Sequence, residues 1–148
     1  MRILPAVAAA IILAGVGAPA AHADTAQPTA DLAMSRLGFS VNASTVTITA
    51  VSTNLGPDPA QPAVQVTVWG GTVKSTVCTF NGRLFPDTSD GDTCEIAPTT
   101  LSGHAGMILK VHVTSPAIVS ASASVYDLNG ATDPNSSNDS KYRQIYVH

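Results

Sequence analysis

Hydrophobic and polar residues alternate along much of the chain with a period of two, which is typical of β-strands that bury one face. The alternation is clearest in four stretches, residues 45–50, 64–68, 107–114 and 119–125. Weaker strand patterns occupy residues 31–37, 73–80, 93–96 and 141–148. No stretch after the first 23 residues shows a helical period. The pattern therefore predicts an all-β domain.

Strong turn signals separate these stretches. The prolines of 54–59 (Asn-Leu-Gly-Pro-Asp-Pro) lack amide donors and cannot continue a strand. Gly70-Gly71 and Asn81-Gly82 favour turns with positive φ, and residues 87–92 and 133–139 read as polar loops. Short strands with a turn every ten or so residues predict an immunoglobulin-like antiparallel β-sandwich of seven to eight strands over residues 30–148. A small closed barrel is the alternative architecture.

Residues 1–23 have the pattern of a secretory signal peptide. Arg2 provides the positive charge, an apolar run follows, and Ala21-His22-Ala23 forms a small-x-small cleavage site. The alternative is an uncleaved anchor helix, which the glycines and prolines of the run disfavour. Cleavage leaves residues 24–148, in which we expect residues 24–29 to form a flexible lead-in. No later apolar run is long enough for a membrane anchor, so we expect a secreted protein, extracellular or associated with the cell envelope.

Composition narrows the possible functions. Hydrophobic residues make up 45% of the chain, so we expect a packed core and not a disordered chain. Charged residues make up only 11%, which argues against a coiled coil. The net charge of −3 gives no electrostatic footprint for nucleic acid. Cys78 and Cys94, the two cysteines, enclose 15 residues in the exported part. A disulfide is expected in an oxidising compartment, and a loop of this size gives about 3 kcal/mol of stabilisation. A redox pair or a zinc site would need closer cysteines or more ligands.

Candidate chemistry is sparse. The motifs of serine hydrolases, zinc proteases and P-loop enzymes are missing, so no catalytic residue and no cofactor is expected. His104, in an expected turn, His112 and His148 read as surface residues without a partner. Asp87, Asp90 and Asp92 offer hard oxygen ligands in a glycine-containing loop, which makes them a weak calcium candidate against a solvated turn.

Trp69 is out of phase with the valines of its strand, which favours an outward direction and makes it a ligand-contact candidate. The alternative is a tryptophan packed at the end of a strand. Together with Phe80, Phe85 and Tyr126 it provides too few rings for a carbohydrate platform. A ligand- or glycan-binding role would need a concave patch beside Trp69.

Several short motifs occur in a family order. They are Asp31-Leu32, the turn Asn54-Leu55-Gly56-Pro57, the pair Cys78 and Cys94, Leu101-x-Gly103, the strand at 107–113, and Asp133-Pro134-Asn135 followed by Asn138-Asp139. In these motifs the chain resembles the bacterial repeat domain catalogued as domain of unknown function eleven, which is close to the cell-adhesion-related domain of bacteria. The resemblance covers about residues 30–148 and departs from the family at Asp139, where a second asparagine is usual, and in a looser loop at 103–106.

The resemblance implies an exported immunoglobulin-like module without catalytic residues. We therefore expect a non-enzymatic structural or interaction module of the bacterial cell envelope or extracellular space. Its partner would be a protein or glycan at the envelope, with no nucleic acid, no membrane anchor after cleavage, and a monomeric state. A secreted ligand- or glycan-binding domain is the alternative.

Overall fold

The computed structural model describes residues 27–85, 89–90, 93–95, 103–114 and 116–148. Seven strands of 8 to 11 residues carry the fold, with three strands of two or three residues and one short 3₁₀ turn. In chain order the elements are β1 Leu32–Asn42, β2 Thr45–Asn54, β3 Pro62–Trp69, β4 Thr72–Phe80, β5 Arg83–Phe85, β6 Ser89–Asp90, β7 Thr93–Glu95, β8 His104–His112, β9 Ala117–Asp127, η1 Ser136–Asn138 and β10 Ser140–Val147. No helix in these ranges is both long and apolar enough to cross a membrane.

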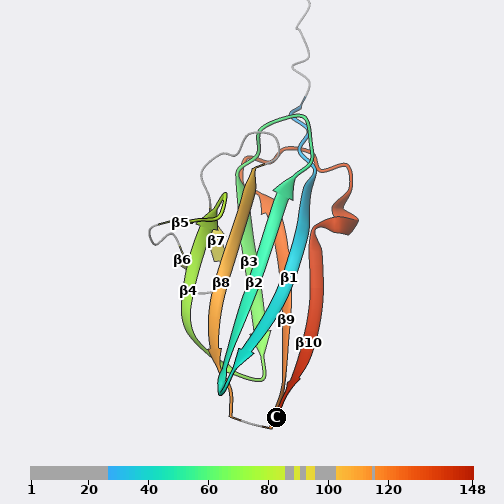
Figure 1. Ribbon diagram of the computed structural model, residues 1–148. Coiled ribbons are helices and arrows are strands. Elements are labelled where there is room, and N and C mark those ends of the chain that lie inside the picture. Colours follow the sequence, from blue (N-terminus) through green and yellow to red (C-terminus); the bar gives the residue numbers. More distant parts are fainter. Residues whose placement is uncertain (1–26, 86–88, 91–92, 96–102, 115) are drawn as a thin grey trace, which may run out of the picture.

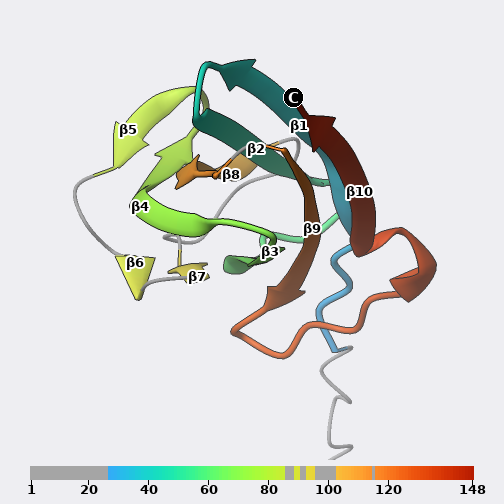
Figure 2. The same ribbon diagram turned by 90° about the horizontal axis from the view of Figure 1, so that it is seen from below.

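Two antiparallel sheets lie face to face, as Figures 1 and 2 show. One has the strand order β1-β2-β8-β4-β5 and the other the order β10-β9-β3-β7-β6. Taken as strands A to G, the seven long strands form the A-B-E-D and G-F-C sheets of an immunoglobulin-like sandwich. The predicted fold class is confirmed, and two separate sheets rule out the closed barrel. The three short strands lie between β4 and β8 in the chain.

The core lies between the sheets and is built from the predicted alternation. On β2, Val46, Ile48 and Ala50 are fully buried and the threonines between them are partly exposed. On β9, Val119 to Val125 repeat the pattern with serines on the outward side. Small and β-branched aliphatic side chains dominate, which suits two closely packed sheets about 10 Å apart.

The two ends of the sandwich differ. Gln27, the β2–β3 loop and the β9–β10 loop lie at one end, here called the N-terminal end, and the C-terminus lies at the other (Figure 1). Within the expected lead-in, Gln27 Nε2 donates to the Gly130 carbonyl at 3.1 Å, and Thr29 forms a β-bridge with Thr132. Residues 27–29 are thus bonded to the β9–β10 loop. The flexibility expected for residues 24–29 as a whole stays a prediction.

Basic side chains close the open side between the sheets, where β1 and β10 run side by side (Figure 2). Lys141 Nζ donates to the Ser35 carbonyl at 2.9 Å, and Arg143 donates to the Leu37 carbonyl at 3.3 Å. The Arg143 guanidinium also lies 6.0 Å from the centre of the Phe39 ring. Charged side chains at an edge strand oppose pairing with strands of other molecules.

Candidate functional site

Cys78 on β4 and Cys94 on β7 form the predicted disulfide, with sulfurs 2.03 Å apart. Both cysteines are buried in the core. Because β4 and β7 belong to different sheets, the bond joins the two layers covalently. Its place in the core gives it a structural role.

The calcium candidate is only partly covered by the structure. Asp87 and Asp92 lie outside the described residues, and Asp90 belongs to β6, where its backbone pairs with that of Thr93. Calcium binding by this loop therefore stays a prediction. Among the residues that are described, no three His, Cys, Asp or Glu side chains lie close enough together to hold a metal ion.

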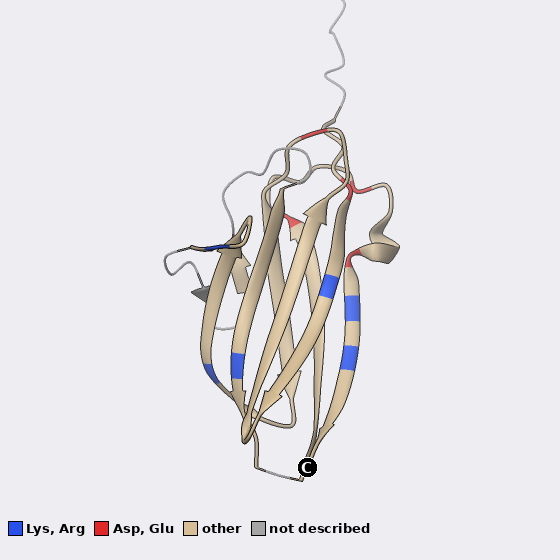
Figure 3. Ribbon diagram, viewed as in Figure 1, with Lys and Arg blue, Asp and Glu red and all other residues tan. Residues whose placement is uncertain are grey.

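Acidic residues gather at the N-terminal end, whereas basic residues lie along the strands (Figure 3). Several of these carboxylates accept hydrogen bonds from loop amides. Asp133 accepts from the amides of Leu32 and Asn135, at 2.9 and 2.8 Å, and Asp127 accepts from those of Gln61 and Ala131, at 2.6 and 2.7 Å. These carboxylates fasten the loops to the ends of the strands.

Asp139 is electrostatically strained in this cluster. Burial raises its pKa, and the neighbouring charges of Asp133 and Asp31, with a hydrogen bond to Asp133, raise that pKa further. One of its carboxylate oxygens is buried without a hydrogen-bond partner. Asp139 is also the position at which the sequence departs from the family pattern, and an asparagine would remove the repulsion.

The turn motif that carries the family resemblance is structural. Asn54 is buried, its amide donates to the Asp58 carbonyl at 2.8 Å, and its side-chain oxygen accepts from the Gly56 amide at 3.0 Å. The Leu55 amide then donates to the Asp31 carbonyl at 2.6 Å, which ties the turn to the start of β1. Both motif turns, at 54–57 and 133–135, thus hold the N-terminal end together.

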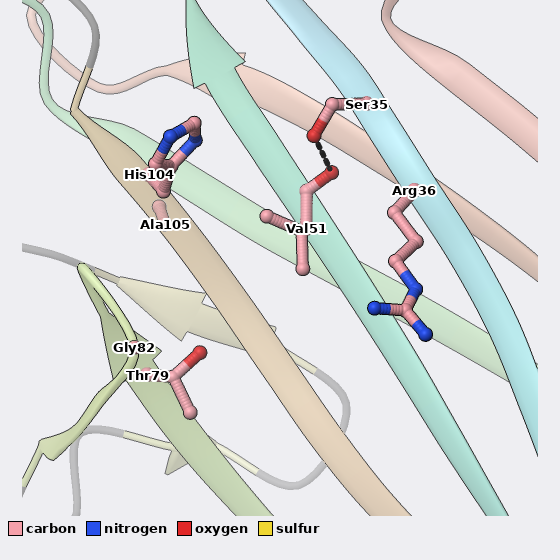
Figure 4. Close-up of a pocket in the computed structure, with 7 residues that line it drawn as sticks. All are labelled: Ser35, Arg36, Val51, Thr79, Gly82, His104 and Ala105. Atoms are coloured by element: carbon pink, nitrogen blue, oxygen red, sulfur yellow. Dashed lines mark hydrogen bonds between the residues drawn. The ribbon is translucent and has the colours of Figure 1, made fainter.

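A pocket of about 320 Å³ opens on the outer face of the β1-β2-β8-β4 sheet (Figure 4). The residues around it are Ser35, Arg36, Val51, Thr79, Gly82, His104 and Ala105. The hollow follows from a missing side chain, because Gly106 lies in the row between Val51 and Thr79. A Cβ on Gly106 would lie 2.7 Å from Thr79 Oγ1, so any larger residue would fill the hollow.

Two polar groups of this pocket, those of Ser35 and His104, are hydrogen-bonded to the sheet. Nδ1 of His104 lies 2.9 Å from Thr53 Oγ1, and the Ser35 hydroxyl donates to the Val51 carbonyl at 2.9 Å. Ser35 and His104 lie on opposite sides of Val51 (Figure 4), so they do not form a nucleophile–base pair. His104 was expected in a turn, but it begins β8 because its backbone pairs with Thr53 on β2.

The outer face of the other sheet carries the chain's tryptophan and all three of its tyrosines. Trp69 is 50% exposed and Tyr142 62%, so these rings are available to a partner. We call this surface the aromatic face. Its large side chains are Trp69 on β3, Ile118 and Tyr126 on β9, and Tyr142 and Tyr146 on β10.

Strand register sets the arrangement of the aromatic face. Trp69 pairs with Ser120, which pairs in turn with Gln144 on β10. Tyr142 and Tyr146 lie on either side of Gln144, about 13 Å apart along the strand. The three rings therefore surround Ser120, and Ser122 and Ser124 continue the line of serines along β9, all three partly exposed.

The β3–β4 turn fixes the position of Trp69. Gly70 has a φ of +83°, and a Cβ there would collide with the carbonyl oxygen of Ile118. The chain can therefore leave β3 only by passing tightly against β9. At the far side of the face, the Tyr146 and His148 rings meet edge to face, with centroids 4.6 Å apart.

Of the two directions left open by the sequence, Trp69 takes the outward one, and the structure gives it neighbours that the sequence pattern does not reveal. The tyrosines of β10 are more than 70 residues away along the chain and reach Trp69 only through β9. Tyr142 and Tyr146 share one face of β10 because they are four residues apart on a strand. The surface is the outer face of the β10-β9-β3 sheet, and the concave patch that the sequence-based alternative required beside Trp69 stays a prediction.

Comparison with known proteins gives a fold and no family assignment. No protein-family model matches the chain, and no curated protein matches it. One similar structure is the crystal structure of the CARDB domain of the PF1109 protein from Pyrococcus furiosus, described as a complex with di-metal ions. Its sequence is 15% identical to this chain, and the two structures superpose with a TM-score of 0.55. The match covers 80% of this chain and 89% of that domain. The solution structure of the same domain is 14% identical, with a TM-score of 0.56, covering 81% and 96%. The chain thus has the immunoglobulin-like fold of a CARDB, or cell-adhesion-related, domain.

Proposed function

We propose that the protein is an exported, non-enzymatic interaction module of the bacterial cell envelope or extracellular space. The observation that carries the proposal is the aromatic face, where Trp69, Tyr142 and Tyr146 are each at least half exposed. Aromatic side chains left uncovered on one side of a domain mark a contact surface, since tyrosine and tryptophan are enriched among the residues that dominate binding energy at interfaces.

Further features support this reading. The likeness to a cell-adhesion-related domain concerns fold alone and is consistent with a binding role. The buried disulfide fits an oxidising compartment, as does the leader pattern of residues 1–23. The motifs shared with domain of unknown function eleven hold loops in place, so they are consistent with membership of that family without implying a reaction.

An enzymatic role has less support. The pocket contains one imidazole, that of His104, and its hydrogen bond goes to a threonine on the neighbouring strand. A nucleophile in such a pair would need a third group to orient the base, and no carboxylate lines this pocket. At the N-terminal end, the carboxylates of Asp133 and Asp127 are engaged with backbone amides.

Fractionation of cells that express the full chain tests export. We expect protein in the envelope or medium whose N-terminus is Asp24 and whose cysteines resist alkylation. Purified residues 24–148 should then sediment with isolated envelopes. The double variant Trp69→Ala/Tyr142→Ala should lose sedimentation, whereas the control Val73→Ala/Leu84→Ala, which truncates exposed apolar side chains of the other sheet, should keep it. Cytosolic protein that keeps Met1, or sedimentation equal in both variants, would contradict the proposal.

A further inference from the structure

We propose that the aromatic face binds a linear, uncharged polysaccharide along β9, by ring stacking and by hydrogen bonds to sugar hydroxyls. The inference rests on the proposed function and specifies the partner. It follows from three properties of the face, which are its side-chain chemistry, its lack of charge and its dimensions.

Side-chain chemistry is the first property. One side of a sugar ring presents C–H groups and packs on an aromatic ring, while its rim presents hydroxyls that need polar partners. Trp69, Tyr142 and Tyr146 provide three exposed ring surfaces. Between and beside them lie uncharged groups that both donate and accept hydrogen bonds. These are Ser120, Ser122 and Ser124 on β9, Thr67 on β3 and Gln144 on β10.

Charge is the second property. The outward positions of β3, β9 and β10 carry no charged side chain. Lys141 and Arg143 lie on β10, but they alternate to the opposite side and bond to β1 carbonyls. Glu95 on the next strand, β7, pairs with Ala63 and is exposed at the border of the face, so the nearest charge there is negative. An anionic polymer would find no cation on this face, so charge complementarity favours an uncharged one.

Dimensions are the third property. Three strands about 4.8 Å apart and eight residues long form a strip of about 14 by 26 Å, or roughly 400 Å². A stable protein interface, including one with a second copy of this chain, needs about 800 Å² on each partner. A long, narrow strip with rings at intervals instead fits an extended chain that contacts it repeatedly.

Trp69 makes the test direct, because it is the only tryptophan and therefore reports on the face by its own fluorescence. Residues 24–148 are titrated with a soluble linear glucan, a linear mannan and a linear galactan, with polygalacturonate as the anionic control. We expect a saturable change of Trp69 emission with at least one neutral polymer and none with polygalacturonate. Slower migration of the protein in native gels that contain the same polymers gives a second measure of binding. This measure does not depend on tryptophan fluorescence, so it can also be applied to the Trp69→Ala variant.

Variants then place the binding on the face. Trp69→Ala and Tyr142→Ala should each weaken binding about tenfold or more, as expected for central aromatic contacts. Tyr142→Phe, which keeps the ring, should retain most of it, and so should Val73→Ala/Leu84→Ala. Because these side chains are exposed, melting temperatures should stay close to that of the unaltered protein.

Different failures have different meanings. Absence of binding to every neutral polymer, or binding that Trp69→Ala leaves unchanged, overturns the glycan proposal. In one further outcome, the protein sediments with envelopes in a Trp69-dependent way, and protease treatment of the envelopes abolishes the sedimentation. That outcome overturns the glycan proposal in favour of a protein partner and leaves the proposed function standing. A dimer in sedimentation velocity that Tyr142→Ala converts to a monomer assigns the face to a second copy and overturns it as well.

Discussion

Replacing Asn54 with alanine should destabilise the domain far more than an ordinary loop substitution. The change removes both side-chain bonds of the β2–β3 turn, the one to the Asp58 carbonyl and the one from the Gly56 amide. Gly56 is itself buried, so its amide cannot turn to water instead. A lost hydrogen bond costs about 1 kcal/mol, and a buried donor left unpaired costs about 1–3 kcal/mol.

Together these terms predict a loss of about 2–4 kcal/mol in the free energy of unfolding. At about 4 °C per kcal/mol for a domain of this size, the melting temperature should fall by about 8–16 °C. Thermal and urea unfolding of residues 24–148, followed by circular dichroism, measure both quantities. Asn42→Ala, at an exposed position of β1, is the control and should change stability by less than about 0.5 kcal/mol. If Asn54→Ala melts within about 2 °C of the unaltered protein, the turn does not hold this end of the sandwich.

Three further changes test the disulfide, the edge strand β10 and the carboxylate cluster of the N-terminal end. Cys78→Ala/Cys94→Ala should lose about 3 kcal/mol and melt on the order of ten degrees lower, and an unchanged melting curve under reducing conditions would contradict a stabilising disulfide. A chain that ends at Asn138 lacks β10, exposes β9 and loses the burial of Val147, so it should aggregate or melt far lower; a soluble product that melts like the full chain would show that the strand is dispensable. Asp139→Asn should raise the free energy of unfolding at neutral pH by on the order of 0.5 kcal/mol. The pKa of Asp139 is raised in the folded state, so the folded protein loses stability as this carboxyl ionises with rising pH, and an asparagine does not ionise. Melting curves of both proteins from acidic to neutral pH should converge at the acidic end, and a variant that is less stable at neutral pH would reverse the sign.

The parts of the fold that depend on local sequence were predictable. The alternation of 45–50 and 119–125 identified the buried faces, because side-chain direction in a strand follows residue parity. The Asn81-Gly82 turn was expected to adopt positive φ and does so, with φ of +48° and +76°. The pairing of Cys78 with Cys94 followed from there being two cysteines and from the expectation of an oxidising compartment.

The candidate site was less predictable because it depends on strand order. Trp69, Tyr142 and Tyr146 come together only when β9 lies between β3 and β10, and periodicity carries no information about neighbours. The pocket depends on Gly106, which as a sequence signal marks a loop. Pairing with Val51 of β2 and Thr79 of β4 draws it into β8 instead, so tertiary context overrides the local preference.

Placing Gln27 and Val147 at opposite ends of the sandwich determines how the domain would carry a mechanical load. A pull between these two residues runs along β1 and β10. The two strands would therefore be sheared past one another, and the contacts between them would have to break together instead of one by one. The Lys141 and Arg143 bonds to β1 lie across that line of force. Resistance to such a pull is governed by the unfolding rate and is separate from equilibrium stability. After rupture, the Cys78–Cys94 bond would keep its loop of 15 residues closed, which shortens the extended chain by about 50 Å.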